Sequence, residues 1–72
     1  MPVVAEPRLR VTLKAVRQEA GLTQAELAER AGVSRKTVNT IENGVFTPSV
    51  TVALLLAQAL DVPLAELFRL EL

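Results

Sequence analysis

The sequence predicts an all-α domain, a compact bundle of five short helices. Three observations support this class. Half of the 72 residues are hydrophobic, which is enough for one core and suits a single domain. Apolar residues recur at helical spacing, and capping residues and glycines separate the helical segments. We recognise neither a strand pattern nor an internal repeat.

The chain is expected to begin with a flexible arm. Pro2 and Pro7 oppose helix formation, so we assign residues 1–9 to the arm and residues 10–72 to the folded domain. No basic start followed by an apolar core indicates a secretory signal. The longest apolar run, 52–57, is far shorter than the roughly 20 residues of a membrane span. We therefore expect a cytoplasmic protein without a membrane partner.

The first two helices are delimited by local signals. Helical spacing starts near Arg10, and Gly21 is expected to end the first helix as a C-terminal cap. Thr23 precedes the second helix, and Glu26 follows three residues later, which is the pattern of a capping box. Gly32 is expected to end this helix.

Serines and a proline mark the later helices. Ser34 is expected to cap a third helix over residues 35–43, and a serine at the start of residues 49–60 caps the fourth. Pro63 suits the first position of a short fifth helix that runs to about residue 68.

Missing residue types exclude several chemistries. The chain has no cysteine and no histidine, so thiolate chemistry and the commonest general base and metal ligand are missing. Nothing pairs the acidic residues with a base or metal in a pocket, so we expect no enzyme, no catalytic residue, no metal and no cofactor. Phe46 and Phe68 are the only aromatic residues, too few for a base-stacking platform.

The charges are unevenly distributed although the net charge is zero. Residues 1–40 hold seven basic and four acidic residues, a net charge of +3. Residues 41–72 hold one basic and four acidic residues, a net charge of −3. A chain polarised in this way can present a cationic face to a polyanion.

Residues 24–43 (QAELAERAGVSRKTVNTIEN) form the most informative segment. Two short helices are joined by AGVS, in which Gly32 can adopt positive φ at a sharp turn. Ala28 is small enough to let the next helix approach closely. This is the arrangement of a helix-turn-helix, whose second helix is free to enter the major groove of DNA.

A helical wheel of residues 35–43 separates an apolar face from a polar one. The polar face carries four side chains suited to reading base edges, with Asn39 the weakest of these candidates: Arg35, Lys36, Asn39 and Thr40. Arginine and lysine donate to guanine, asparagine pairs with adenine, and a threonine methyl meets that of thymine. An ordinary solvated helix face is the alternative.

The segments LKAVRQEAGLTQAELAERAGVSRKTVNTIENG and PSVTVALLLAQALDVPLAELF resemble the phage-repressor or Cro-like helix-turn-helix family, also called the xenobiotic-response-element (XRE) type. They lie within residues 13–68. The resemblance implies a five-helix, lambda-repressor-like domain that binds double-stranded operator DNA, usually as a homodimer, and regulates transcription.

The resemblance also implies roles for individual residues. Gln24, Ser34 and Asn43 match positions that contact phosphates, although Ser34 and Asn43 are equally well explained as helix caps. Arg17 and Glu42 match a partly buried, structural ion pair between the first and third helices.

The fourth helix is apolar almost all round, which predicts burial on more than one side. We expect a two-fold homodimer whose interface includes Leu55, Ala59, Leu64, Phe68 and Leu70. Phe46 has two interpretations: it covers the edge of the core, or it lies against the sugar-phosphate wall of DNA.

We therefore expect a small, nucleoid-associated repressor that reads an inverted repeat through its third helix. The alternative is a protein-interaction module, or a DNA-binding antitoxin, whose main partner is another protein.

Overall fold

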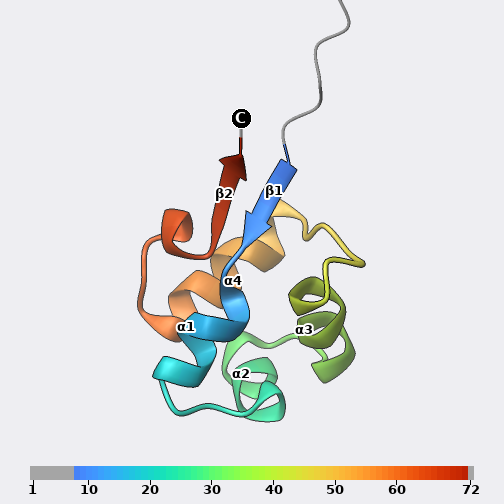
Figure 1. Cartoon of the computed structure of the whole chain (residues 1–72). Helices are drawn as coiled ribbons and strands as arrows, with labels where there is room; N and C mark the ends of the chain where they lie inside the picture. The colour runs from blue at the N-terminus through green and yellow to red at the C-terminus, as the bar shows by residue number, and fades with distance from the viewer. Residues whose placement is uncertain (1–7, 72) are drawn as a thin grey trace, which may run out of the picture.

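Four α-helices and a two-stranded sheet make up the fold. The computed structural model describes residues 8–71. The helices are α1 (Leu13–Glu19), α2 (Gln24–Ala31), α3 (Arg35–Glu42) and α4 (Val50–Leu60). Figure 1 shows them gathered into one body, with α3 at its side and the sheet projecting from one end.

The predicted helix caps are present where the local signals placed them. Thr23 Oγ1 accepts a hydrogen bond from the Glu26 amide at 3.0 Å, and Glu26 Oε1 accepts one from the Thr23 amide at 3.0 Å, which completes the capping box. Ser34 and Ser49 cap α3 and α4 through their side-chain oxygens. Gly32 ends α2 with a φ of +74°, as expected for a left-handed cap.

The prediction of an all-α, five-helix fold is wrong at both ends of the domain. Strand β1 (Arg8–Val11) pairs antiparallel with β2 (Phe68–Glu71), so the first helix begins at Leu13 rather than near Arg10. In place of the fifth helix there is a single 3₁₀ turn, η1 (Leu64–Glu66). The chain cannot continue as a helix here, because the Leu67 carbonyl accepts a hydrogen bond from Thr12 N at 2.9 Å and the next residues pair with β1.

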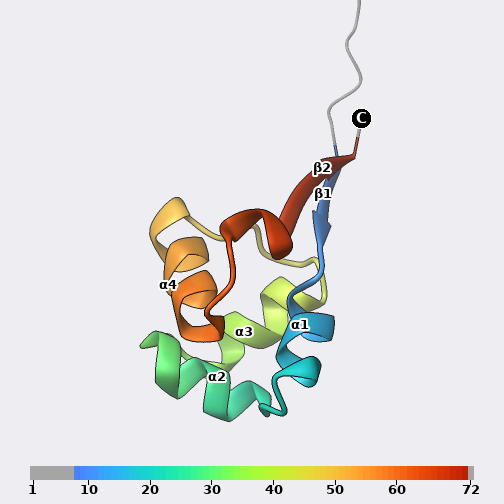
Figure 2. The same cartoon turned by 90° about the vertical axis from the view of Figure 1, so that its left-hand side faces the viewer.

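The sheet includes the last two residues of the predicted arm. Residues 1–7 of that arm lie outside the described residues, whereas Arg8 and Leu9 belong to β1. One face of the strand pair carries Leu9 and Val11 opposite Leu70 and Phe68. Figure 2 shows the pair from a second side, again projecting from the helices.

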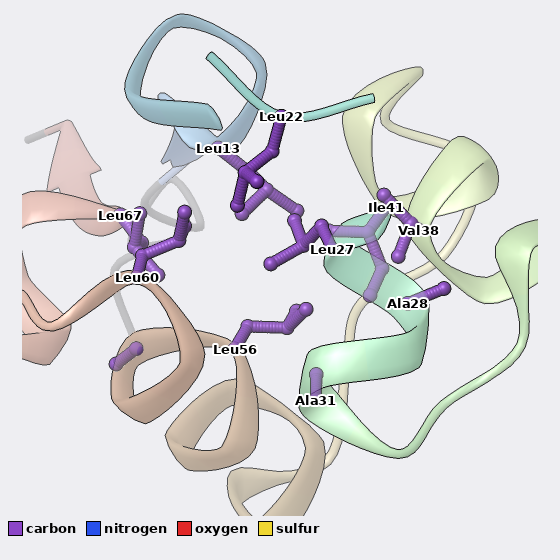
Figure 3. Packing of buried hydrophobic residues seen from close by; sticks show 11 residues of the cluster. Leu13, Leu22, Leu27, Ala28, Ala31, Val38, Ile41, Leu56, Leu60 and Leu67 are labelled. Carbon is purple, nitrogen blue, oxygen red and sulfur yellow. The ribbon is translucent and has the colours of Figure 1, made fainter. Parts of the chain in front are cut away.

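The core lies between the four helices and the 3₁₀ turn. Its largest fully buried side chains come from α1, α2, α3, α4 and the residue after η1: Leu13, Leu27, Val38, Ile41, Leu56 and Leu67. Figure 3 shows how they converge. Because Val38 and Ile41 occupy the inner face of α3, its opposite face is directed away from the body.

Candidate nucleic-acid interface

The outer face of α3 carries the side chains predicted to read bases. Arg35, Lys36 and Asn39 are exposed, and Thr40 is half-buried. The turn before α3 fixes this orientation, because Gly32 adopts positive φ and Val33 N donates to the Ala28 carbonyl at 3.0 Å. The result is a short helix with a polar, cationic face open to solvent.

An ion pair connects this helix to α1. Arg17 Nε donates to Glu42 Oε2 at 2.7 Å, and its Nη2 donates to Oε1 at 3.0 Å. The two side chains are only 9% and 2% exposed, and Arg17 Nη1 also donates to the Leu22 carbonyl at 2.8 Å. A bidentate ion pair of this kind fixes the orientation of α3 relative to α1 as well as the distance between the two helices.

The environment of Glu42 keeps its carboxylate ionised. Burial favours the neutral acid, but hydrogen bonds from Arg17 and Gln24 and the charges of Arg17 and Lys14 outweigh it. The pKa of Glu42 therefore lies below its ordinary value. The hydrogen bond to Glu42 raises the pKa of Arg17 in spite of burial.

A chain of side-chain amides leads from the ion pair to the surface. Gln24 Nε2 donates to Glu42 Oε1 at 3.0 Å, and Gln24 Oε1 accepts from Asn39 Nδ2 at 3.4 Å. Asn39 Oδ1 in turn accepts from Asn43 Nδ2 at 3.2 Å. We call Gln24, Asn39 and Asn43 the amide chain. Sequence reasoning named all three but missed their connection, because no local spacing signals a bond between α2 and α3.

The other flank of α3 is apolar. Thr40 Oγ1 donates to the carbonyls of Lys36 and Thr37, at 3.0 and 3.1 Å. The Thr37 hydroxyl lies 2.8 Å from that of Ser34, whose oxygen also accepts from Thr37 N. With both threonine hydroxyls engaged, their methyl groups are left for other contacts.

These residues line a shallow hollow with the loop that follows α3. The hollow has a volume of about 340 Å³ and is bounded by Lys36, Thr37, Thr40, Val45 and Phe46. Phe46 is 46% exposed and belongs neither to the core nor to the half-buried residues packed against it. Both interpretations of Phe46 stay predictions, because its side chain is neither buried nor fully exposed.

The residues predicted for a dimer interface differ in exposure. Leu55, Ala59, Leu64 and Phe68 are half-buried and pack against the core, whereas Leu70 is 63% exposed. A second hollow, of about 180 Å³, lies between the sheet, the loop before α4 and the start of α4. Its lining is Leu9, Thr47, Pro48, Val50, Ala53, Leu64 and Phe68.

The described part of the chain gives no structural basis for a metal centre or a membrane span. Within residues 8–71, no three acidic side chains come together in a group that could hold a metal ion. None of the helices described there is both long and apolar enough to cross a bilayer.

Comparison with known proteins agrees with this geometry. The helix-turn-helix family model matches residues 13–67. An uncharacterized HTH-type transcriptional regulator of Methanothermobacter thermautotrophicus is 46% identical over 52 residues, which cover 72% of this chain and 75% of that protein.

Solved structures show the same likeness. The restriction-modification controller protein C.AhdI from Aeromonas hydrophila has a TM-score of 0.73 at 37% identity, over 75% of this chain and 82% of that chain. SinR of Bacillus subtilis, solved in complex with DNA, has a TM-score of 0.69 at 34% identity, over 72% of this chain and 84% of that chain. The chain belongs to the XRE-type helix-turn-helix family of transcriptional regulators.

Proposed function

We propose that this protein is a sequence-specific DNA-binding repressor that inserts α3 into the major groove. The observation that carries this proposal is the two-sided character of α3. Val38 and Ile41 are fully buried, while Arg35, Lys36 and Asn39 project from the opposite face. The major groove of B-DNA is about 12 Å wide and admits an α-helix with its polar face toward the base edges.

The roles of the base-reading residues follow from their chemistry. Arg35 and Lys36 donate to guanine O6 and N7. Asn39 pairs with adenine through its amide, and Thr40 offers its methyl group because its hydroxyl is bound to helix carbonyls.

The phosphate contacts come from the ends of the two helices. Gln24 lies at the first position of α2, where free backbone amides favour an anion. Ser34 caps α3, and Asn43 follows its last residue. These three residues position the protein on the duplex without reading its sequence.

We further propose a homodimer on an inverted repeat with half-sites about 34–36 Å apart. Outside the loop that follows α3, the apolar side chains most available for the interface are Val50, Leu54 and Leu70, which are 72%, 51% and 63% exposed. Leu70 belongs to the interface predicted from the sequence, and Val50 and Leu54 supplement it. Sedimentation equilibrium of the wild type and of Leu54→Ser with Leu70→Ser is the direct test, and a wild type that stays monomeric at tens of micromolar refutes the dimer.

Selection from random duplexes, followed by titration of the selected operator, tests DNA binding. We expect Arg35→Ala and Lys36→Ala each to weaken operator binding by about 5- to 150-fold, the equivalent of about 1–3 kcal/mol per base contact. Arg69→Ala, an exposed arginine on β2, is the matched control and should bind as the wild type does.

Two results would refute the assignment. Unchanged operator affinity in both α3 variants would show that this face does not read DNA. Failure to select any duplex, together with a stable complex with a different protein, would favour the interaction module instead. In vitro transcription from a promoter that contains the operator distinguishes repression from activation.

A further inference from the structure

The apolar hollow beside α3 has no place in the roles given so far, except through Lys36 and Thr40. Val45 and Phe46 form its outer wall and belong to the loop between α3 and α4. Both are exposed, at 77% and 46%. Two neighbouring exposed apolar side chains next to a polar, cationic helix face suit a partner that offers an apolar group at this place.

The loop is fixed against the helix. The amides of Val45 and Phe46 both donate to the Thr40 carbonyl, at 3.0 and 3.3 Å. Gly44 makes this return possible with a φ of +71°, and its own amide donates to the Ile41 carbonyl at 3.1 Å. Val45 and Phe46 are therefore held beside the last turns of α3.

The floor of the hollow is apolar because of how its threonines are bonded. The hydroxyls of Thr37 and Thr40 are engaged with Ser34 and with helix carbonyls, which leaves two methyl groups. Lys36 contributes its aliphatic stem and brings a positive charge to the rim. The hollow is thus apolar inside and attractive to a polyanion at its edge.

From this we infer that the hollow accepts the 5-methyl group of a thymine, and that Val45 and Phe46 determine sequence specificity from outside the helix-turn-helix. The inference rests on the proposed function. If α3 lies in the major groove, its flank meets base edges, and the thymine methyl is the apolar group that the four base pairs present there. The two flanks of α3 then differ in chemistry, with the amide chain on one side and the methyl site on the other.

Replacement of thymine by deoxyuridine provides the test, because it removes the methyl group and keeps the base pairing. Each thymine of the selected operator is replaced in both half-sites, and affinity is measured by fluorescence anisotropy. We expect a loss of about fourfold per half-site at one position, which corresponds to the burial of one methyl group.

Variants of the loop locate the site. Val45→Ser and Phe46→Ser should bind the thymine and deoxyuridine operators equally, so that the difference of about fourfold per half-site disappears. Leu9→Ser is the matched control, since Leu9 is 39% exposed but lines the other hollow, and it should keep this difference. Circular dichroism checks that each variant is folded.

Several results would overturn the inference. A wild type with no methyl dependence at any thymine refutes it, and the proposed function stands if Arg35→Ala still weakens operator binding. Loop variants that lose affinity equally for both operators indicate a contact with the sugar-phosphate wall. Val45→Ser that alters only self-association indicates a second copy in the hollow. Absence of selective binding to any duplex refutes the proposed function as well.

Discussion

Replacing Arg17 with methionine leaves the buried carboxylate of Glu42 without its cation, while much of the side-chain volume is kept. The side chain of Glu42 is 2% exposed, and it loses hydrogen bonds of 2.7 and 3.0 Å while keeping the one from Gln24. Breaking a buried pair on one side costs about 3–5 kcal/mol. At roughly 0.05–0.15 kcal/mol per residue, a chain of 72 residues has a total free energy of unfolding of about 4–11 kcal/mol. Arg17→Met should therefore lose a large part of the stability.

Urea denaturation at pH 7, followed by circular dichroism, measures this loss. The control is Arg30→Met, an exposed arginine in the last turn of α2, where a cation contributes less than about 1 kcal/mol. If Arg17→Met unfolds within 1 kcal/mol of the wild type, the ion pair does not have the structural role that its geometry indicates.

The pH dependence separates a stranded charge from lost packing. In the wild type the pKa of Glu42 is below its ordinary value of 4.5, so its stabilising contribution is present above pH 4.5 and is lost as the pH falls through the folded-state pKa. In Arg17→Met, burial is no longer outweighed and the folded-state pKa rises above that of the unfolded chain. Lowering the pH then stabilises the variant, because a protonated Glu42 carboxyl is neutral and no longer needs a cation beside it. The difference in free energy of unfolding between wild type and Arg17→Met should become smaller from pH 7 to pH 4. A difference that stays constant would indicate that only packing is lost.

Three further changes test the local geometry through the thermal midpoint, which moves by about 4–8 °C per kcal/mol in a domain of this size. Gly32→Ala should lower the free energy of unfolding by about 1–2 kcal/mol, because alanine is strained at a φ of +74°. The new methyl group meets no atom within 4 Å, so backbone strain is the only cost, and an unchanged midpoint would show that the turn relaxes freely. Asp61→Gly should raise the midpoint, because Asp61 has a φ of +54° at the end of α4, and a lower midpoint would reveal a stabilising role for its carboxylate. Ser34→Ala should cost about 1 kcal/mol as a lost helix cap, and Ser34→Gly less; equal losses would argue against capping.

The helices were predictable because their signals are local. A capping residue, an apolar face and a terminal glycine lie within one or two turns of each other, so Thr23 and Gly32 define α2 without reference to the rest of the chain. The fully buried positions of α3 followed from the same periodicity.

The sheet was not predictable by that reasoning. Each strand has only four residues, and nearly the whole domain lies between them. Leu9 and Val11 alternate with arginines, as do Phe68 and Leu70 with Arg69, but so short an alternation becomes informative only when both ends are placed together. Pairing of the chain ends is a non-local event that propensity does not encode.

The sequence allows the residues of the candidate site to be named, but not the hydrogen bonds between them. The sequence shows that Gln24 and Asn39 are polar and lie on neighbouring helices, but their bond depends on the crossing of α2 and α3. In the same way, the hydroxyl of Thr40 appears free in the sequence and is bound in the structure. Which group of a side chain remains available for DNA is decided by these bonds.

In the proposed function, stability and recognition share residues, and Glu42 belongs to both. Its carboxylate accepts from Arg17 on the inner side, which holds α3 to α1, and from Gln24 on the outer side, which begins the amide chain. A hydrophobic pair in place of Arg17 and Glu42 could stabilise the fold equally well. It could not orient Gln24, because the acceptor for its amide would be missing. Burying an ion pair here costs desolvation free energy. The presence of the pair is therefore better explained by its role in orienting the α3 surface than by a contribution to core stability.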